Sequence, residues 1–370
     1  MSQTFGPPFR ADQVGSLVRP APLLEARLKH DRGELAHDEL AHIEDAEIRR
    51  TVRLQEDIGF DVVTDGEFRR ASWNRDFLLK FEHVVLGPSR ITLDSGGKAE
   101  RAPTALAVTG KISRPQPIFV GHFAFLRSVA QATPKLTIPS PTILHFRGGR
   151  ESIDTKAYPE MEAFYADVAR VYSEEIRDLA AAGCRYLQID DVNFAYICDP
   201  RVAAQVRAMG EDPDMLPHTY AKLINAAIVA RPAGMTVGLH VCRGNAPSGW
   251  TEGSYEPVAD ILFNEIDVSV YFLEYDSPRA GDFKPLRLLP KGKTVVLGLV
   301  STKTTTLEDK DALKRRIEEA ARFVPLDQLA ISTQCGFSSG MTTAGGRGMT
   351  EANEIAKLRL VIEVAREVWN

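Results

Sequence analysis

Four residues of the types that bind metal ions stand at the carboxyl ends of apolar, β-branched runs: His240, Cys242, Glu274 and Cys335. His240 and Cys242 are separated by one residue, so on a strand their side chains leave the same face. Thiolates favour zinc, and imidazole and carboxylate groups are also common zinc ligands. This set of residues therefore predicts a tetrahedral zinc site, provided that the three runs end at the same edge of a sheet.

Three other candidate ligands are less well placed along the chain. Glu265 is an alternative acidic ligand, but it precedes its strand and is expected at the opposite end of the sheet. Cys184 follows a helix-ending glycine, and Cys198 lies in a loop. Because a buried cysteine commonly behaves as a small hydrophobic residue, we predict that both of these cysteines are structural.

The runs that carry the four ligands belong to an alternation of strand and helix patterns. Eight short, mostly apolar segments predict the strands of a parallel sheet covered on both faces: 11–16, 62–67, 135–141, 186–192, 236–242, 268–275, 294–300 and 329–335. Amphipathic patterns predict helices at about 37–58, 159–182, 219–229, 307–323 and 351–368. Gly59 and Gly183 follow two of these helices, where a left-handed C-cap is expected.

Eight strands alternating with helices favour an α/β fold of the (β/α)8 TIM-barrel type over an open sheet. An open nucleotide-binding sheet carries a glycine-rich turn after its first strand. The sequence contains neither GxGxxG nor a Walker A motif. The Gly- and Pro-rich stretch at about 86–117 fits no barrel unit. We expect it to be an insertion after the second unit, a β-hairpin over the barrel mouth, within one elaborated domain that spans residues 1–370.

In such barrels the active site is built at the carboxyl ends of the strands. Besides the four candidate ligands, the strand ends carry several polar and ionisable residues: Ser16, Asp65, Glu67, Ser140, Asp190, Asp191, Ser301 and Lys303. The sequence therefore predicts that metal ligands and free carboxylates converge on one rim.

Composition limits the class of protein and its partners. The chain has 370 residues, a formal net charge of -5 and no basic block, which argues against nucleic acid or an anionic membrane as a partner. No segment approaches the roughly 18 apolar residues of a membrane helix, and the N-terminus lacks the regions of a secretory signal. Four cysteines are too few for a disulfide framework. We expect a soluble, cytoplasmic protein with reduced thiols.

Seven motifs, in order along the chain, resemble the cobalamin-independent methionine synthases, specifically members that consist of one catalytic-half-like barrel. They are FRADQVGSLVRP (9–20), TDGEFRR (64–70), LTIPSPTILHF (136–146), YLQIDD (186–191), HVC (240–242), FLEYD (272–276) and STQCGF (332–337). The resemblance covers nearly the whole chain. It implies zinc held by His240, Cys242, Glu274 and Cys335, and methyl transfer to homocysteine to give methionine.

The implied chemistry agrees with the ligand types. A free thiol is mostly protonated at neutral pH, whereas the thiolate is the nucleophile. Zinc would deprotonate the substrate thiol, and two cysteine ligands would leave the bound sulfur electron-rich. Glu274 would yield its place to the incoming sulfur, which gives the open position that a catalytic zinc requires.

The resemblance also implies roles for other residues of the rim. Ser16 matches the segment that binds the carboxylate of homocysteine, and Glu67 and Asp190 match the carboxylates that hold its amino group. For Glu67 the alternative is an ion pair with a nearby arginine, of which Arg10, Arg69 and Arg70 are the candidates. Phe146 falls where an aromatic residue is expected beside a stacked pterin.

Asp191 stands where the family usually has glutamate, which leaves its role open. Three other departures leave the methyl donor open between methylfolate and another donor. The aromatic residue expected beside a stacked pterin is Phe146 and not tryptophan. The long synthases carry a histidine after the seventh strand, whereas this chain reads GLVSTKT, with Ser301 and Lys303 in that region. Finally, the N-terminal half of the long enzymes is absent.

Two alternative functions use the same zinc site. Related single-barrel proteins open epoxides with coenzyme M, a thiol that carries a sulfonate and no amino group. Arg19 or Arg243 would supply the cation for such a substrate, whereas free Glu67 and Asp190 favour homocysteine. In the other alternative the barrel is non-catalytic and the metal is structural, which would require four fixed ligands and no adjacent pocket.

Overall fold

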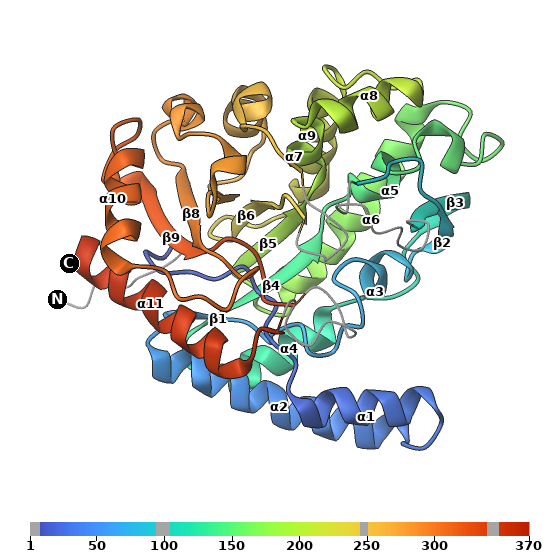
Figure 1. Cartoon of the computed structure of the whole chain (residues 1–370). Coiled ribbons are helices and arrows are strands. Elements are labelled where there is room, and N and C mark those ends of the chain that lie inside the picture. The colour runs from blue at the N-terminus through green and yellow to red at the C-terminus, as the bar shows by residue number, and fades with distance from the viewer. Residues whose placement is uncertain (1–7, 94–103, 245–250, 339–347, 370) are drawn as a thin grey trace.

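Seven parallel strands form one curled sheet in the order β1-β4-β5-β6-β7-β8-β9 (Figure 1). The computed structural model describes residues 8–93, 104–244, 251–338 and 348–369. The strands are β1 (Val62–Val63), β4 (Thr133–Pro139), β5 (Tyr186–Asp191), β6 (Thr236–Val241), β7 (Val270–Glu274), β8 (Thr294–Val300) and β9 (Leu329–Thr333). All seven are buried along nearly their whole length, as their continuous apolar runs require.

The eighth position of the barrel is filled by an extended N-terminal segment instead of a regular strand. On one side the Asp12 amide donates to the Ile331 carbonyl at 3.0 Å, and the Ile331 amide donates to the Arg10 carbonyl at 2.9 Å. On the other side the Thr64 hydroxyl donates to the Gly15 carbonyl at 2.6 Å. This segment therefore connects β9 to β1 and closes the sheet into a barrel.

Helices cover the outside of the sheet (Figure 1). Neighbouring helices contact one another in sequence around the barrel: α11 (Glu351–Trp369), α2 (His37–Ile58), α4 (Val120–Val129), α6 (Met161–Ala181), α9 (Leu216–Ile228) and the π-helix η3 (Ile261–Glu265). α10 (Lys310–Ala320) lies against β8 and α11. Shorter helices occupy loops: α1 (Ala21–Asp31), α3 (Arg75–Leu78), α5 (Ile143–Phe146), α7 (Asn193–Ile197) and α8 (Pro200–Ala208).

An antiparallel hairpin interrupts the barrel between its second and third strands. β2 (Glu82–Pro88) pairs with β3 (Thr104–Ser113), and both lie between β1 and β4 in the chain. β3 packs against α5 and α6, which places the hairpin on the flank of the barrel where β4 ends. The inserted segment thus falls where the Gly- and Pro-rich stretch predicts it.

The predicted (β/α)8 barrel is confirmed, with local differences in two of its strands. The predicted strand 62–67 ends at Val63, because Gly66 and Glu67 have φ angles of 64° and 60° and turn the chain. The predicted strand 11–16 forms only a single bridge at Ala11, because its last residues bend to bring Ser16 toward β1 and β9. The left-handed conformations predicted for Gly59 and Gly183 are confirmed, with φ of 108° and 99°.

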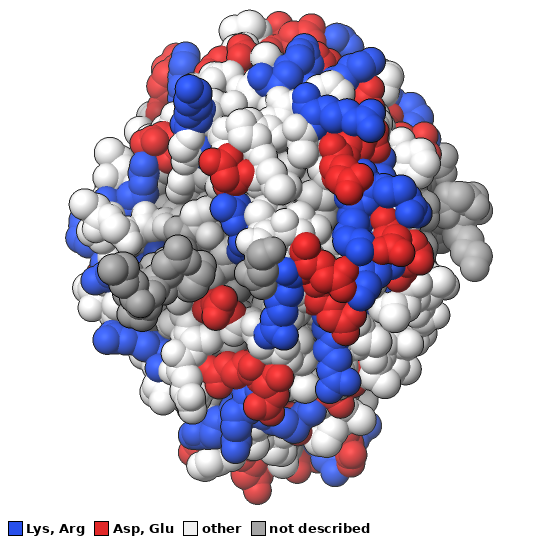
Figure 2. Space-filling view, turned by 90° about the vertical axis from the view of Figure 1, so that its left-hand side faces the viewer, with Lys and Arg blue, Asp and Glu red and all other residues white. Residues whose placement is uncertain are grey.

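The outer surface over α10 and α11 carries charges of both signs. Figure 2 shows lysine and arginine side chains interleaved with aspartate and glutamate on this face. Lys310 and Lys314 of α10 both pair with Glu367 of α11, at 2.6 and 2.9 Å. Among the helices of the described residues, none is long and apolar enough to cross a membrane.

Candidate metal centre

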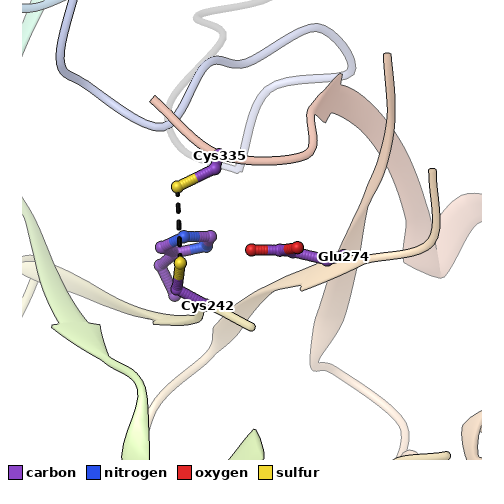
Figure 3. A group of neighbouring side chains, drawn as sticks. Cys242, Glu274 and Cys335 are labelled. Carbon is purple, nitrogen blue, oxygen red and sulfur yellow. Dashed lines mark hydrogen bonds between the residues drawn. The ribbon is translucent and has the colours of Figure 1, made fainter. Parts of the chain in front are cut away.

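Four side chains at the ends of strands β6, β7 and β9 converge at the rim of the barrel: His240, Cys242, Glu274 and Cys335. Their ligand atoms all lie within 4.8 Å of one another, and all four residues are buried. Figure 3 shows Cys242, Glu274 and Cys335 pointing toward a common centre. The parallel register explains the convergence, since β6, β7 and β9 all end at this edge of the sheet.

The imidazole of His240 is oriented by the neighbouring strand. Its Nδ1 faces the Phe272 carbonyl of β7 at 3.3 Å, whereas its Nε2 is buried and has no hydrogen-bond partner. A ligating histidine usually donates its other ring N–H to a carbonyl or carboxylate, which fixes the tautomer. The unpaired Nε2 is thus the atom that is free to bind a cation.

The two cysteine sulfurs lie 3.4 Å apart and cannot both ionise easily without a cation between them. The hydrogen bond to Cys335, together with burial, raises the pKa of Cys242 well above its ordinary value. The Gly244 amide donates to the Cys242 sulfur at 3.3 Å and provides partial positive charge. A cation bound between the two sulfurs would favour their ionised form.

Glu274 completes the cluster as a carboxylate held in place by other groups. Its Oε1 accepts a hydrogen bond from the Arg243 amide at 2.9 Å, and its Oε2 accepts one from Lys303 Nζ at 3.1 Å. Burial opposes ionisation, but the charges of Lys303 and His240 keep the pKa of Glu274 below its ordinary value. Glu274 is therefore ionised at neutral pH.

These observations fit a divalent cation. The cluster offers one unpaired imidazole nitrogen, two sulfurs whose ionisation needs a positive charge, and one carboxylate. Leaving a buried nitrogen unpaired is unfavourable unless something binds it. The residues therefore form a site that a metal ion can occupy.

Glu67 lies on the same rim, in a conformation that only a constrained turn maintains. It follows Gly66, is buried and has a φ of 60°. Its Oε1 accepts a hydrogen bond from the Thr137 hydroxyl at 2.8 Å and lies 3.5 Å from the guanidinium of Arg70. Its Oε2 is buried without a partner. The alternative ion pair with Arg70 is thus present, yet it uses only one carboxylate oxygen.

Asp190 lies beside the cluster on β5. In the register of the sheet it stands opposite His240 of β6, and its Oδ1 accepts a hydrogen bond from Gln188 Nε2 at 2.7 Å. Burial, reinforced by the negative charge of Glu67, raises the pKa of Asp190 to about 7. Glu67 and Asp190 are therefore buried carboxylates close enough for the charge of Glu67 to oppose the ionisation of Asp190.

Ser16 packs directly against the loop that carries Cys335. A Cβ atom added to Gly336 would lie 1.9 Å from Ser16 Oγ, so only glycine fits between the two segments. The Phe337 amide donates to the Ser16 carbonyl at 2.8 Å. Ser16, Glu67, Asp190 and the four candidate ligands are thus brought together at one end of the barrel.

Phe146 lies farther from the cluster. It is buried in α5, and its ring contacts Tyr196 and Tyr220 at centroid distances of 6.3 and 6.4 Å. Burial and, to a smaller extent, the nearby charges of Cys242 and Glu274 raise the pKa of Tyr196, so this ring lies close to the cluster. One aromatic ring therefore separates Phe146 from the metal ligands.

The remaining candidates of the sequence have structural contacts. Glu265 pairs with His218 at 2.8 Å at the end of η3, outside the cluster. Cys184 and Cys198 donate to the Tyr186 and Phe194 carbonyls, and burial raises the pKa of each thiol to about 12. Asp191 accepts hydrogen bonds from the Asn193 and Phe194 amides and so caps the start of α7.

Sequence reasoning left Lys303 without a role and missed several supporting residues. Lys303 contacts Glu274, as described above, and Arg279 NH2 lies 3.7 Å from the same carboxylate oxygen. Thr137 and Arg70 hold Glu67. Lys303 is three residues beyond the end of β8, which is a usable signal, whereas Arg279 lies in a loop whose path the sequence does not indicate.

Comparisons with known proteins agree with this geometry. A sequence model of the family described as cobalamin-independent synthase, catalytic domain, matches residues 9–366. Two proteins of Bacillus subtilis (strain 168) named uncharacterized protein YxjH and YxjG are each 44% identical to this chain, over 98% of its length and 95% of theirs. The 5-methyltetrahydropteroyltriglutamate–homocysteine methyltransferase of Thermotoga petrophila is 26% identical, over 90% of this chain and 42% of that protein.

Solved structures show the same fold. A putative vitamin-B12 independent methionine synthase from Listeria monocytogenes is 36% identical, with a TM-score of 0.78 and 98% of each chain covered. A B12-independent methionine synthase from Shewanella sp. W3-18-1, solved in complex with selenomethionine, is 21% identical, with a TM-score of 0.73 and 97% of each chain covered. The family match over nearly the whole chain and the 44% identity to two full-length relatives show that this protein belongs to the cobalamin-independent methionine synthase family.

Proposed function

We propose that this protein is a zinc-dependent thiol alkyltransferase that transfers a methyl group to homocysteine, giving methionine. The observation that carries the proposal is the convergence of His240, Cys242, Glu274 and Cys335 on the rim that also holds the buried carboxylates of Glu67 and Asp190. Tetrahedral zinc places its ligand atoms about 3.3–3.8 Å apart, a spacing that the 4.8 Å limit of this cluster accommodates. Two thiols in the ligand set favour zinc over harder cations.

The protein's own residues would bind and orient both zinc and substrate. The Phe272 carbonyl holds the tautomer of His240 that presents Nε2 to the metal. The two cysteines, as thiolates, would balance the charge of the ion. When bound, zinc supplies the positive charge that lets the substrate thiol lose its proton at neutral pH. All four ligands are buried, so water is excluded from the nucleophile.

Glu67 and Asp190 are proposed to hold the amino group of homocysteine. Glu67 Oε2 is unpaired, and the raised pKa of Asp190 indicates that a second negative charge is unfavourable there without a cation. An ammonium group would supply that cation and pair with both carboxylates. Ser16, beside Gly336, is proposed to bind the substrate carboxylate, and Phe146 to line the site of the methyl donor. The Shewanella relative was solved with selenomethionine, an amino acid of the same class as this product.

The proposal includes a reducing, cytoplasmic setting. All four cysteines are free, and the sulfurs of Cys242 and Cys335 lie close enough that an oxidising environment would favour a disulfide between them. A disulfide would remove two of the four ligands. The methyl donor is proposed to be methylfolate or another small methyl carrier.

Arg243 favours a second candidate, the addition of a sulfonate thiol such as coenzyme M to an epoxide. Its guanidinium is fully buried beside Cys242, its three nitrogens have no hydrogen-bond partner, and it stacks on the Tyr255 ring at 3.9 Å. Arg19, the other candidate cation, is already engaged by the Ser338 and Glu67 carbonyls at 2.7 and 3.2 Å. The unpaired Oε2 of Glu67 still favours an amino thiol.

A competition assay with the zinc-loaded protein tests these alternatives. Homocysteine, coenzyme M and other small thiols are each incubated with methylfolate, methylcobalamin or a short epoxide, and the thioethers are identified by mass. We expect methionine from homocysteine and a methyl donor. If coenzyme M and the epoxide give the only thioether, the second candidate is correct, and if homocysteine is never methylated, our proposal fails.

Replacement of one sulfur ligand tests the assignment of the site. In Cys335→Ser we expect zinc affinity to fall by about 100-fold or more, because a hydroxyl is a much poorer zinc ligand than a thiolate, and methyl transfer to disappear with it. Metal content is measured after dialysis against a chelator. Cys184→Ser is the matched control, since Cys184 is buried but bonded only to the Tyr186 carbonyl, and it is expected to retain zinc. Retention of zinc in Cys335→Ser would contradict the ligand assignment.

A further inference from the structure

Among the four candidate ligands, Glu274 differs in already having cationic partners. Its Oε2 lies 3.1 Å from Lys303 Nζ and 3.7 Å from Arg279 NH2, and its Oε1 accepts from the Arg243 amide. His240 instead faces a backbone carbonyl, and Cys242 accepts from a backbone amide. A carboxylate shared with two cations donates less electron density to a metal than an unshared one.

The side chains of Lys303 and Arg279 are held beside Glu274 by the loops that follow β8 and β7. They are only 8% and 11% exposed, so neither is a mobile surface charge. Both border a cavity of about 570 Å³. Arg279 is also tied to Asp276 at 3.2 Å, and Glu308, the other acid of the cavity, pairs with Lys357. Lys303 thus remains available to Glu274.

The contacts of Lys303 and Arg279 with Glu274 matter because ligand exchange in a buried site would otherwise leave a charge unpaired. When a thiol replaces a carboxylate ligand, the carboxylate becomes an unpaired buried charge unless a cation is already in contact with it. Glu274 is fully buried. With Lys303 and Arg279 in place, Glu274 keeps its charge paired whether or not it also binds a metal.

We propose that Lys303, assisted by Arg279, is a positioning residue that makes Glu274 the exchangeable ligand of the cluster. The pair keeps the Glu274 carboxylate in an ion pair while the substrate thiol takes its place, and it weakens Glu274 as a ligand beforehand. This inference rests on the proposed function, because it assumes that a thiol enters the cluster. It gives Lys303 a role in substrate binding.

The test uses the full-length protein loaded with Co²⁺, whose spectrum reports both the ligand set and the binding of a thiolate. Metal affinity is measured by chelator competition, and homocysteine affinity by the thiolate-to-cobalt charge-transfer band. In Lys303→Met we expect homocysteine to bind about tenfold to 100-fold more weakly, because displaced Glu274 loses its main partner, while Co²⁺ binds as tightly as before or more tightly. Lys303→Arg, which keeps the charge, is expected to restore most of the homocysteine affinity.

The same Lys303→Met change, made in a Glu274→Gln variant, separates pairing with Glu274 from a general structural role of Lys303. In Glu274→Gln the side chain that the thiol displaces is neutral and needs no cationic partner. Adding Lys303→Met is therefore expected to change homocysteine affinity by less than about twofold. The inference is overturned if Lys303→Met alone leaves homocysteine affinity unchanged, or if it weakens Co²⁺ and homocysteine by the same factor. These titrations are independent of turnover: a wild-type protein that binds both ligands but makes no methionine refutes only the proposed function, and one that binds no metal refutes both.

Discussion

Two groups of buried polar side chains lie within this barrel, and they differ in how completely their hydrogen-bonding atoms are paired. The inner cluster consists of Asp12, Lys135, Tyr186 and Gln188, inside the sheet. The rim cluster consists of His240, Cys242, Glu274 and Cys335 together with Glu67, at the carboxyl ends of the strands. Both are removed from solvent, so burial alone does not distinguish them.

In the inner cluster every polar side-chain atom has a partner. Lys135 Nζ donates to Asp12 Oδ1 at 2.6 Å, to Gln188 Oε1 at 3.0 Å and to the Gln13 carbonyl, which uses all three of its protons. The second oxygen of Asp12 accepts from the Tyr186 hydroxyl at 2.8 Å. Such a closed network leaves nothing for a ligand to bind.

In the rim cluster the pairing is incomplete at specific atoms. His240 Nε2 and Glu67 Oε2 are buried and unpaired, and the two sulfurs have each other as side-chain partners. A buried polar atom without a hydrogen-bond partner lowers the stability of a folded protein, and binding of a ligand can supply the missing partner. Between these two clusters, unsatisfied atoms, more than buried charge, distinguish the candidate site.

The largest effect on stability is expected when the inner cluster is broken. Lys135→Met would leave Asp12 as an unpaired buried carboxylate, because Lys135 and Asp12 are both 0% exposed. Removing one partner of a buried pair typically costs about 3–5 kcal/mol of unfolding free energy. Urea unfolding measures the loss, and metal content per folded molecule is expected to stay unchanged.

A double variant serves as the control for this prediction. Lys135→Met combined with Asp12→Asn removes both charges, so part of the lost stability should return. If Lys135→Met is as stable as the wild type, or if it loses zinc while remaining folded, the inner cluster is not a purely structural network and the contrast between the two clusters is wrong.

Glu354 of α11 is a buried acid that belongs to neither cluster, yet its pKa is also shifted, so it provides a further comparison. It accepts a hydrogen bond from the Val18 amide at 2.7 Å, and burial raises its pKa to about 8. A carboxyl group with a raised pKa in the folded state stabilises the protein below its unfolded pKa, and this contribution is lost as the pH rises through the folded pKa. The wild type should therefore lose stability relative to Glu354→Gln between about pH 4.5 and pH 8.

The change with pH in the difference between their unfolding free energies is expected to be a few kcal/mol at most, since one pKa unit corresponds to about 1.4 kcal/mol. Urea unfolding of both proteins at several pH values between 5 and 9 measures it. Parallel stability profiles would show that Glu354 does not titrate in this range. Homocysteine binding is expected to be the same in both, which would establish that a raised pKa alone does not mark a functional residue.

The fold and the convergence of the four candidate ligands were accessible from the sequence for one physical reason. Each ligand ends a continuous apolar run, and the parallel strands of a barrel all end at one edge, so strand position alone brings His240, Cys242, Glu274 and Cys335 together. The helix predicted at 37–58 agrees with α2 because its amphipathic period is long and Gly59 ends it.

The inner cluster and the partners of Glu274 were not accessible in this way. Asp12 and Lys135 are 123 residues apart, and their pairing depends on which strands become neighbours when the barrel closes. Lys135 starts its apolar run and looks like a solvent-facing flank in the sequence. Arg279 lies in a loop, and the left-handed φ of Glu67 is imposed by tertiary contacts that local propensity does not encode.

The smallest effect is expected at Glu67, where we propose that substrate completes the cluster. In Glu67→Gln the amide oxygen can still accept from Thr137, so unfolding free energy should change by less than about 1 kcal/mol. Homocysteine should bind about tenfold more weakly, because the unpaired Oε2 no longer offers a charge to its ammonium group. Isothermal titration of the zinc-loaded proteins measures both affinities.

A thiol without an amino group provides the control, since it has nothing to present to Glu67. We expect 4-mercaptobutyrate, which is homocysteine without that group, to bind the wild type and Glu67→Gln equally well. Equal weakening of both thiols would mean that Glu67 acts on the shape of the site or on zinc itself. Unchanged homocysteine binding would mean that the unpaired oxygen has no role in recognition, and then unsatisfied atoms would not distinguish the rim cluster from the inner one.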